Sequence, residues 1–176
     1  MLSQTRFIVI SLTIYASWSI TSLECHAQVV PFKASGDQAI YSPLTGETSG
    51  PGKATHMGEV FGSGLALPGV EIGPGLFEWS APNYQFEAAN GDQIALSGGG
   101  TVQFVPLPTS GIFIAVWFGE FNVIPGAGTG RFAEVAPGTG PIQVVAINDP
   151  FTFPPNPGDI WTYNWSLDGD IDLGKQ

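Results

Sequence analysis

The chain has 176 residues, of which 43% are hydrophobic and only 11% are charged, and its formal net charge is −10 at pH 7. The few basic residues are scattered along the sequence, so they do not predict a basic patch, and nucleic acid and anionic lipid headgroups are poor partners for such a surface. We interpret the negative charge as a feature that keeps the protein in solution.

The first 27 residues have the pattern of a cleaved export signal. Arg6 precedes an apolar stretch over residues 7–23, and small Ala27 is a suitable last residue before cleavage at Gln28. An uncleaved membrane anchor is the first alternative, but the stretch is short for a span and is interrupted by Thr and Ser. A lipoprotein is the second, although Glu24 stands where a small residue is expected ahead of the lipidated cysteine.

We therefore expect a mature protein of residues 28–176 that is secreted or periplasmic and has no membrane contact after cleavage. The only cysteine of the sequence, Cys25, would be lost with the signal, so no disulfide is expected. A chain of this size buries roughly 68–70% of its unfolded surface, which is enough for one independent domain. No repeat or charge block divides it.

Residues 52–64, GKATHMGEVFGSG, hold His56, the only histidine of the expected mature chain. Strand alternation would put His56 on a face of small residues, shared with Ala54, Gly58, Val60 and Gly62. That face could leave room for a ligand beside the imidazole or accept bulky side chains from across the core. His56 is then either a structural histidine satisfied by a hydrogen bond or the polar handle of an apolar pocket.

The residue types do not indicate a metal site or a nucleophile. A zinc site needs three or four ligands, and the mature chain offers no cysteine and no second histidine. No G-x-S-x-G motif marks a nucleophilic serine. We predict no catalytic residue, no metal and no cofactor.

Residues 83–99, NYQFEAANGDQIALSGG, predict a β-hairpin. A three-residue loop over 89–91, with Gly91 in the left-handed conformation, pairs Phe86 with Ile94 and Tyr84 with Leu96 on one face. Glu87 then faces Gln93 on the other side. A two-residue loop would mix polar and apolar residues on each face, so the alternation selects the longer loop.

Residues 111–125, GIFIAVWFGEFNVIP, predict a long strand that is apolar on both faces. Trp117 belongs to one face, and Glu120 is the first polar residue of the other face, which is formed by Ile112, Ile114, Val116 and Phe118. Such a strand needs a partner subunit or a loop outside it, or an apolar cavity inside it. Gly119 would let the strand bend, as barrel closure requires.

His56, Glu120 and Trp117 are the three candidate ligand-binding residues. The pKa of Glu120 would be raised if its face were closed to water. The simpler interpretation places Glu120 where the strand emerges from its cover.

Residues 160–168, IWTYNWSLD, predict a strand with one aromatic face and one polar face, as antiparallel sheets allow. The carboxylates that follow, Asp168, Asp170 and Asp172, do not fit an EF-hand loop, because Leu173 occupies the position that requires glycine. We interpret them as a solvated face; a weak calcium contact is the alternative.

Apolar runs rich in Val, Ile and aromatic residues, with Gly and Pro between them, indicate an all-β domain. Evenly spaced strands with glycine-rich corners fit a closed antiparallel barrel or a sandwich. No substantial helix is expected after the signal.

Four segments resemble a group of exported bacterial proteins of unassigned function with an allene-oxide-cyclase-like, or dirigent-like, β-barrel. The segments are VVPFKASG, GKATHMGEV, FEAANGDQIAL and PGAGTGRFAEV, in this order. They span residues 30–135, whereas the Pro-rich segment 150–157 and the last strand match loosely. The resemblance implies a single antiparallel barrel of about eight strands. It does not imply cyclase activity, and no catalytic residue is carried over.

The sequence leads to three functional interpretations. The first is a non-catalytic barrel that binds a small apolar ligand or forms a homo-oligomer. The second is a cofactor-free isomerase or cyclase that acts inside the barrel. The third is a structural or adhesive surface protein, suggested by the apolar face around residues 112–118.

Overall fold

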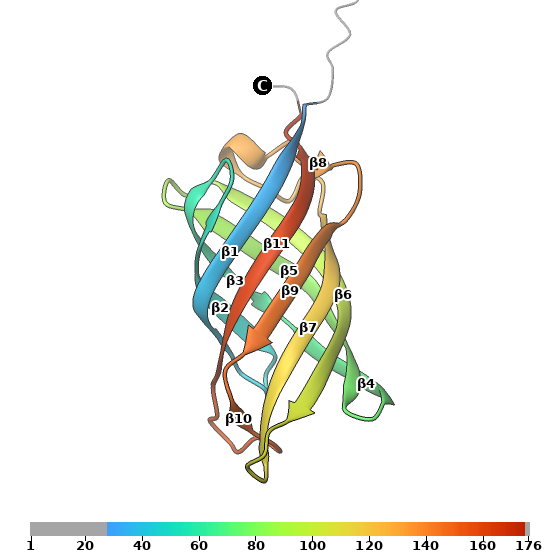
Figure 1. The fold of residues 1–176 in the computed structure, drawn as a ribbon. Coiled ribbons are helices and arrows are strands. Elements are labelled where there is room, and N and C mark those ends of the chain that lie inside the picture. The colour runs from blue at the N-terminus through green and yellow to red at the C-terminus, as the bar shows by residue number, and fades with distance from the viewer. Residues whose placement is uncertain (1–27, 175–176) are drawn as a thin grey trace, which may run out of the picture.

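The computed structural model describes residues 28–174. The expected signal segment and Ala27 lie outside the described residues, and Gln28 is the first residue described. The fold is a closed antiparallel β-barrel, as the sequence predicts (Figure 1).

Eight strands form the ring, and each pairs with the next until the last pairs with the first (Figure 1). In ring order they are β1 (Val29–Tyr41), β2 (Glu47–Ala54), β3 (Gly58–Leu65), β5 (Leu76–Ala88), β6 (Gln93–Pro106), β7 (Ile112–Val123), β9 (Ile142–Asn148) and β11 (Trp161–Asp172). We call the end of the barrel where β1 begins and β11 finishes the terminal end. The turn between β1 and β2 lies at the opposite end.

Three short strands and one helical turn lie outside the ring. β4 (Leu67–Gly73) pairs with β5 and extends away from the barrel, β8 (Ala136–Pro137) pairs with β11, and β10 (Phe151–Thr152) pairs with β7 (Figure 1). A 3₁₀ helix, η1 (Gly130–Phe132), lies near the terminal end. Among the described residues no helix is long and apolar enough to cross a membrane.

The predicted hairpin is confirmed in register. Phe86 lies opposite Ile94 and Tyr84 opposite Leu96, while Glu87 lies opposite Gln93 on the outer face. Gly91 has a φ of 85°, the left-handed conformation that the three-residue loop requires. This hairpin fixes which side chains of β5 and β6 enter the barrel.

The predicted two-faced pattern of β7 is also confirmed. Its inner residues Ala115, Trp117 and Phe121 are buried in the barrel. Its outer face is open: Phe118 is 51% exposed, and Ile147 on neighbouring β9 is 47% exposed. No described segment covers this outer face.

Gly119 does more than let β7 bend. A Cβ at this position would lie 2.6 Å from the Trp79 ring and 2.3 Å from the backbone oxygen of Gly99. The Trp79 indole N–H donates to the backbone oxygens of Thr101 and Phe118, at 3.2 and 3.1 Å. Glycine here lets a large side chain lie flat on the inner wall of the barrel.

The prediction that His56 lies on a strand was wrong. His56 lies in the turn between β2 and β3, at the terminal end, with a φ of 64°. Histidine tolerates this conformation better than bulky or β-branched residues do. The chain therefore reverses at His56 instead of running through it, and the face shared with Ala54 and Gly58 does not exist.

The barrel interior is packed at both ends. Eight large side chains are fully buried, mostly toward the terminal end: Phe32, Phe86, Ile94, Leu96, Phe132, Val135, Ile142 and Ile171. At the opposite end Phe104, Phe113, Phe151, Phe153 and Trp161 form a cluster of aromatic rings. Between these two packed regions the interior is hollow.

Candidate functional site: an aromatic cavity inside the barrel

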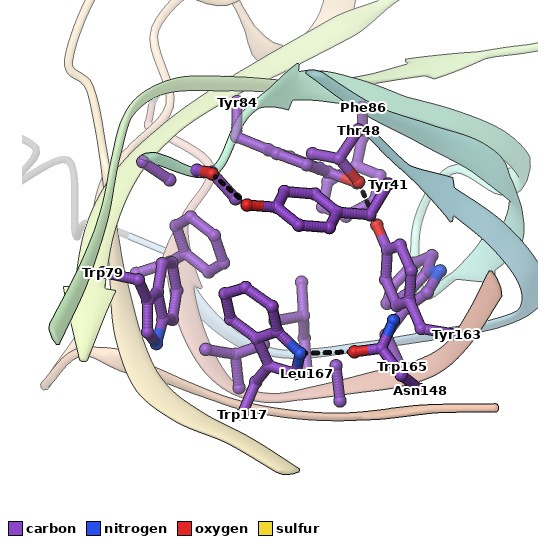
Figure 2. Close-up of a pocket in the computed structure, with 15 residues that line it drawn as sticks. Tyr41, Thr48, Trp79, Tyr84, Phe86, Trp117, Asn148, Tyr163, Trp165 and Leu167 are labelled. Atoms are coloured by element: carbon purple, nitrogen blue, oxygen red, sulfur yellow. Dashed lines mark hydrogen bonds between the residues drawn. The ribbon is translucent and has the colours of Figure 1, made fainter. Parts of the chain in front are cut away.

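The hollow region is a cavity with almost entirely apolar walls (Figure 2). The centre of a water-sized sphere can occupy about 70 Å³ of it. This free space exceeds the roughly 10–15 Å³ that one water occupies, so the cavity has room for several waters or a small organic molecule. Its lining residues come from six of the eight ring strands and from Ala66: Tyr41, Thr48, Ala66, Trp79, Ala81, Tyr84, Phe86, Trp117, Phe121, Val144, Ala146, Asn148, Tyr163, Trp165 and Leu167.

Three of the four tryptophans in the described residues line the cavity: Trp79, Trp117 and Trp165. Trp117 meets Tyr41 edge-on at 5.4 Å and Trp79 edge-on at 5.9 Å between ring centroids. Such edge-to-face contacts add about 0.5–1.5 kcal/mol each to the energy of burial. The rings hold one another in place, so the cavity has rigid walls.

Trp165 lies against the wall where two glycines leave space. A Cβ on Gly36 would lie 2.6 Å from its indole nitrogen, and a Cβ on Gly52 would lie 2.6 Å from its ring. The N–H of Trp165 has no acceptor among the described residues. It lies at the strand wall beside Gly36, so we do not assign it to ligand binding.

Two polar side chains in the cavity are joined to each other. The Trp117 indole N–H donates to Asn148 Oδ1 at 2.6 Å (Figure 2). Asn148 Nδ2 donates to the backbone oxygen of Thr162 at 3.2 Å. Asn148 is only 3% exposed. These bonds compensate for the burial of the amide and fix the orientation of the Trp117 ring.

Three hydroxyl groups meet at another point of the cavity wall. The Thr48 and Tyr163 hydroxyls are hydrogen-bonded (Figure 2). The Tyr84 hydroxyl lies close enough to Tyr163 to affect the pKa of both groups. Thr48 comes from β2, Tyr84 from β5 and Tyr163 from β11. We call these three groups the hydroxyl cluster.

Burial raises the pKa of all three tyrosines in the described residues. It raises the pKa of Tyr41 to about 12, and the Tyr41 hydroxyl donates to the backbone oxygen of Ala66 at 3.2 Å. The pKa of Tyr84 is well above its usual value because of burial and the neighbouring Tyr163. The pKa of Tyr163 is raised by burial, although contacts with Thr48 and Tyr84 oppose the shift. These phenols are neutral hydrogen-bonding groups at physiological pH.

Of the three candidate residues, only Trp117 lines the cavity. Glu120 lies on the exposed outer face of β7, where its Oε1 accepts a hydrogen bond from Gln143 Nε2 at 3.0 Å. Glu120 is therefore open to water together with the rest of this uncovered face.

His56 lies at the exposed terminal end, where its Nε2 is 3.1 Å from the backbone oxygen of Pro31. The Arg131 guanidinium donates to the backbone oxygen of His56 at 2.8 Å and to Asp92 Oδ2 at 2.9 Å. Hydrogen bonds lower the pKa of Asp92. The bond from the Asn90 side chain contributes most, and the bonds and charge of Arg131 add to it. His56 borders a separate polar hollow outside the barrel and does not reach the aromatic cavity.

The structure identifies lining residues that the sequence analysis did not propose. Tyr84 and Tyr163 were placed correctly on inward faces, but nothing in the sequence marked them as neighbours. Asn148 ends a run of alternating inward residues, Ile142, Val144 and Ala146, and this alternation could have revealed it. Thr48 lies in the glycine-rich strand β2 and has no such signal.

The aspartates near the C-terminus contact single partners. Lys33 Nζ lies 3.0 Å from Asp168 Oδ2, and Thr139 donates to Asp170 Oδ2 at 2.7 Å. No group of three metal-ligating side chains occurs within residues 28–174.

The cavity thus defines a class of protein by its geometry: a closed eight-stranded barrel with an apolar interior site. No family model, curated protein or solved structure matches the chain.

Proposed function

We propose that this barrel binds a small, mainly apolar molecule in its aromatic cavity and does not transform it chemically. The single observation that carries this proposal is the hollow between two packed ends of the barrel, walled by aromatic rings and bordered by a few oriented polar groups. Ligand sites commonly have this composition, with apolar walls and a small number of placed hydrogen-bonding groups.

The chemistry of the lining favours binding over catalysis. A cofactor-free isomerase or cyclase, the alternative, needs a group that exchanges a proton near neutral pH. The only titratable side chains that line the cavity are Tyr41, Tyr84 and Tyr163, whose raised pKa values keep them protonated. These phenols can orient a ligand.

We also propose that the protein is exported after cleavage at Gln28 and belongs to the exported barrel proteins that its four segments resemble. The closed antiparallel barrel is compatible with that resemblance. Export would place the ligand in the periplasm or outside the cell.

Filling the cavity should abolish binding. Ala146 lies on the inner face of β9 opposite Trp117 and Trp165, so the substitution Ala146→Leu would project three extra carbons into the hollow. We expect affinity for a neutral probe, ethylnaphthalene, to fall more than about tenfold, since two groups cannot share one packed space. An NMR titration that monitors the four indole N–H signals measures this affinity.

The matched control is Val145→Leu on the same strand, because Val145 faces outward and is 38% exposed. It should leave the affinity unchanged. Equal affinity of the Ala146→Leu variant and the wild type would contradict binding in this cavity. Thermal unfolding of both variants checks that neither substitution disrupts the barrel.

Self-association is a second candidate function, favoured by the open outer face of β7 and β9. This face carries Phe118, Val145 and Ile147, and side chains of this kind are usually covered when they are contiguous. An adhesive or structural role would use the same face against another partner.

The substitution Phe118→Glu should separate these roles from ligand binding. If copies associate through this face, a buried carboxylate at its centre opposes pairing, and sedimentation should show a dimer becoming a monomer. Ethylnaphthalene binding should not change, because Phe118 points away from the cavity. A wild-type protein that stays monomeric at high concentration contradicts the self-association candidate.

A further inference from the structure

We propose that the cavity selects neutral molecules that carry a hydrogen-bond acceptor, such as a ketone, an ester or an ether, and that the hydroxyl cluster binds this acceptor. The inference rests on the proposed binding function and specifies its ligand class. It follows from a count of hydroxyl protons and from the absence of charged side chains in the cavity lining.

The hydroxyl cluster has one proton more than its internal contacts can use. Thr48, Tyr84 and Tyr163 each contribute one O–H, which gives three donors. The hydrogen bond between Thr48 and Tyr163 uses one of these protons, whichever group donates, and a bond between Tyr84 and Tyr163 would use at most one more. No further acceptor in the described residues takes a proton from these hydroxyls. At least one donor therefore remains for a group that enters the cavity.

The other donors in the cavity lining are already engaged, apart from the unpaired N–H of Trp165, which lies against the strand wall beside Gly36. The Tyr41 hydroxyl donates to Ala66 O, the Trp117 indole donates to Asn148 Oδ1, and Asn148 Nδ2 donates to Thr162 O. Figure 2 shows the bonds of Tyr41 and Trp117 at other points of the cavity wall than the contact between Thr48 and Tyr163. The spare proton is thus confined to one point of an otherwise apolar wall, and a ligand must place its acceptor there.

The cavity also discriminates against charge. Its lining contains no Lys, Arg, His, Asp or Glu. A ligand carboxylate would lose its hydration and gain one neutral hydrogen bond, which does not compensate for burying an anion. A cation would find no carboxylate and would meet the spare proton. Neutral molecules with one acceptor fit both constraints.

Three probes with the same naphthalene ring, substituted at the same position, test this selection. Acetylnaphthalene has a neutral acceptor, ethylnaphthalene has none, and naphthalenecarboxylate is an anion. We expect the ketone to bind about tenfold more tightly than the hydrocarbon, as one good neutral hydrogen bond predicts. The carboxylate at neutral pH should bind more than about a hundredfold more weakly than the ketone.

The decisive variant is the combination Thr48→Val, Tyr84→Phe and Tyr163→Phe, which removes every hydroxyl of the cluster. It should keep its affinity for ethylnaphthalene and lose the preference for the ketone. The matched control is Tyr41→Phe, which removes a hydroxyl whose proton is already used by Ala66, and it should keep the preference.

The outcomes separate the inference from the function on which it rests. A wild-type protein that binds the ketone and the hydrocarbon equally, a combined variant that keeps the preference, or tight binding of the carboxylate each overturns the inference but leaves cavity binding intact. Failure of both neutral probes to bind contradicts the proposed function itself.

If the combined variant does not fold, infrared spectra of the wild-type complex decide. When the carbonyl carbon of acetylnaphthalene carries a heavy isotope, its C=O stretching frequency in the complex can be read separately from the protein. This frequency should be lower than in hexane, because a hydrogen bond weakens the C=O bond. A stretch equal to the hexane value shows a carbonyl without a donor and overturns the inference.

Discussion

Raising the pH above about 10 should unfold this protein cooperatively, and its tyrosines should ionise only as it unfolds. All three tyrosines of the described residues project into the barrel interior, and burial raises each pKa above the ordinary value of 10.0. The unfolded chain releases these protons at about pH 10, whereas the folded barrel holds them. Stability that is fully present below pH 10 is therefore lost as the pH rises through the folded-state values.

The loss should be large for a domain of this size. The pKa of Tyr41 rises from 10.0 to about 12, which corresponds to about 3 kcal/mol of folding free energy at high pH. Tyr84 and Tyr163 shift in the same direction and add to this loss. The free energy of unfolding of a typical domain is only about 5–15 kcal/mol. Unfolding near pH 12 is therefore the expected result.

Ultraviolet absorbance of tyrosinate and circular dichroism, recorded on the mature protein over the same pH series, test this expectation. The two transitions should coincide. The control variant Tyr41→Phe has one proton fewer to release and should show a shallower pH dependence. Smooth ionisation near pH 10 in a protein that keeps its native spectrum would mean that the phenols are in contact with water.

Replacing Gly36 with Ala should destabilise the barrel by about 3 kcal/mol or more, because the new methyl group has no space. A Cβ at Gly36 would lie 2.3 Å from the backbone oxygen of Pro51 and 2.6 Å from Nε1 of Trp165. The first neighbour is a backbone atom and the second belongs to a buried ring between strands. Neither can move without a large cost in folding free energy.

Gly140→Ala is the matched control for this substitution. Its Cβ would have no heavy atom within 4 Å, and its φ is not in the left-handed region. Denaturant unfolding should show a stability within about 0.5 kcal/mol of the wild type for this surface change. Equal stability of the Gly36→Ala and Gly140→Ala variants would show that Trp165 does not lie against the wall between β1 and β2.

Much of the barrel could be predicted because its strands alternate strictly. In the hairpin, Tyr84, Phe86, Ile94 and Leu96 sort to one face only in one register, so local patterning was sufficient. The aromatic face of β11 follows from the same rule. Closure of the ring, however, was distinguished from a sandwich only by the resemblance, because strand pairing between β1 and β11 joins distant segments.

The site was harder to predict, for two physical reasons. Short turns without glycine or proline at their centre resemble strands, so the reversal at His56, completed by Gly58 in the left-handed conformation, was missed. The hydroxyl cluster joins Thr48, Tyr84 and Tyr163 from three strands, and a meeting of that kind depends on barrel stagger, which no local pattern specifies. Trp117 does line the cavity, but a strand that is apolar on both faces does not show which face is inward.

Whether the interior holds a ligand is the central question, and native mass spectrometry of the mature protein, purified gently from its own host, addresses it most directly. We predict a reproducible added mass, no larger than that of a substituted naphthalene, that disappears in the Ala146→Leu variant, and the released compound should be neutral and contain a carbonyl, ester or ether group. A bare protein that also fails to bind ethylnaphthalene or acetylnaphthalene would contradict this account and leave the cavity as a packing defect of the barrel.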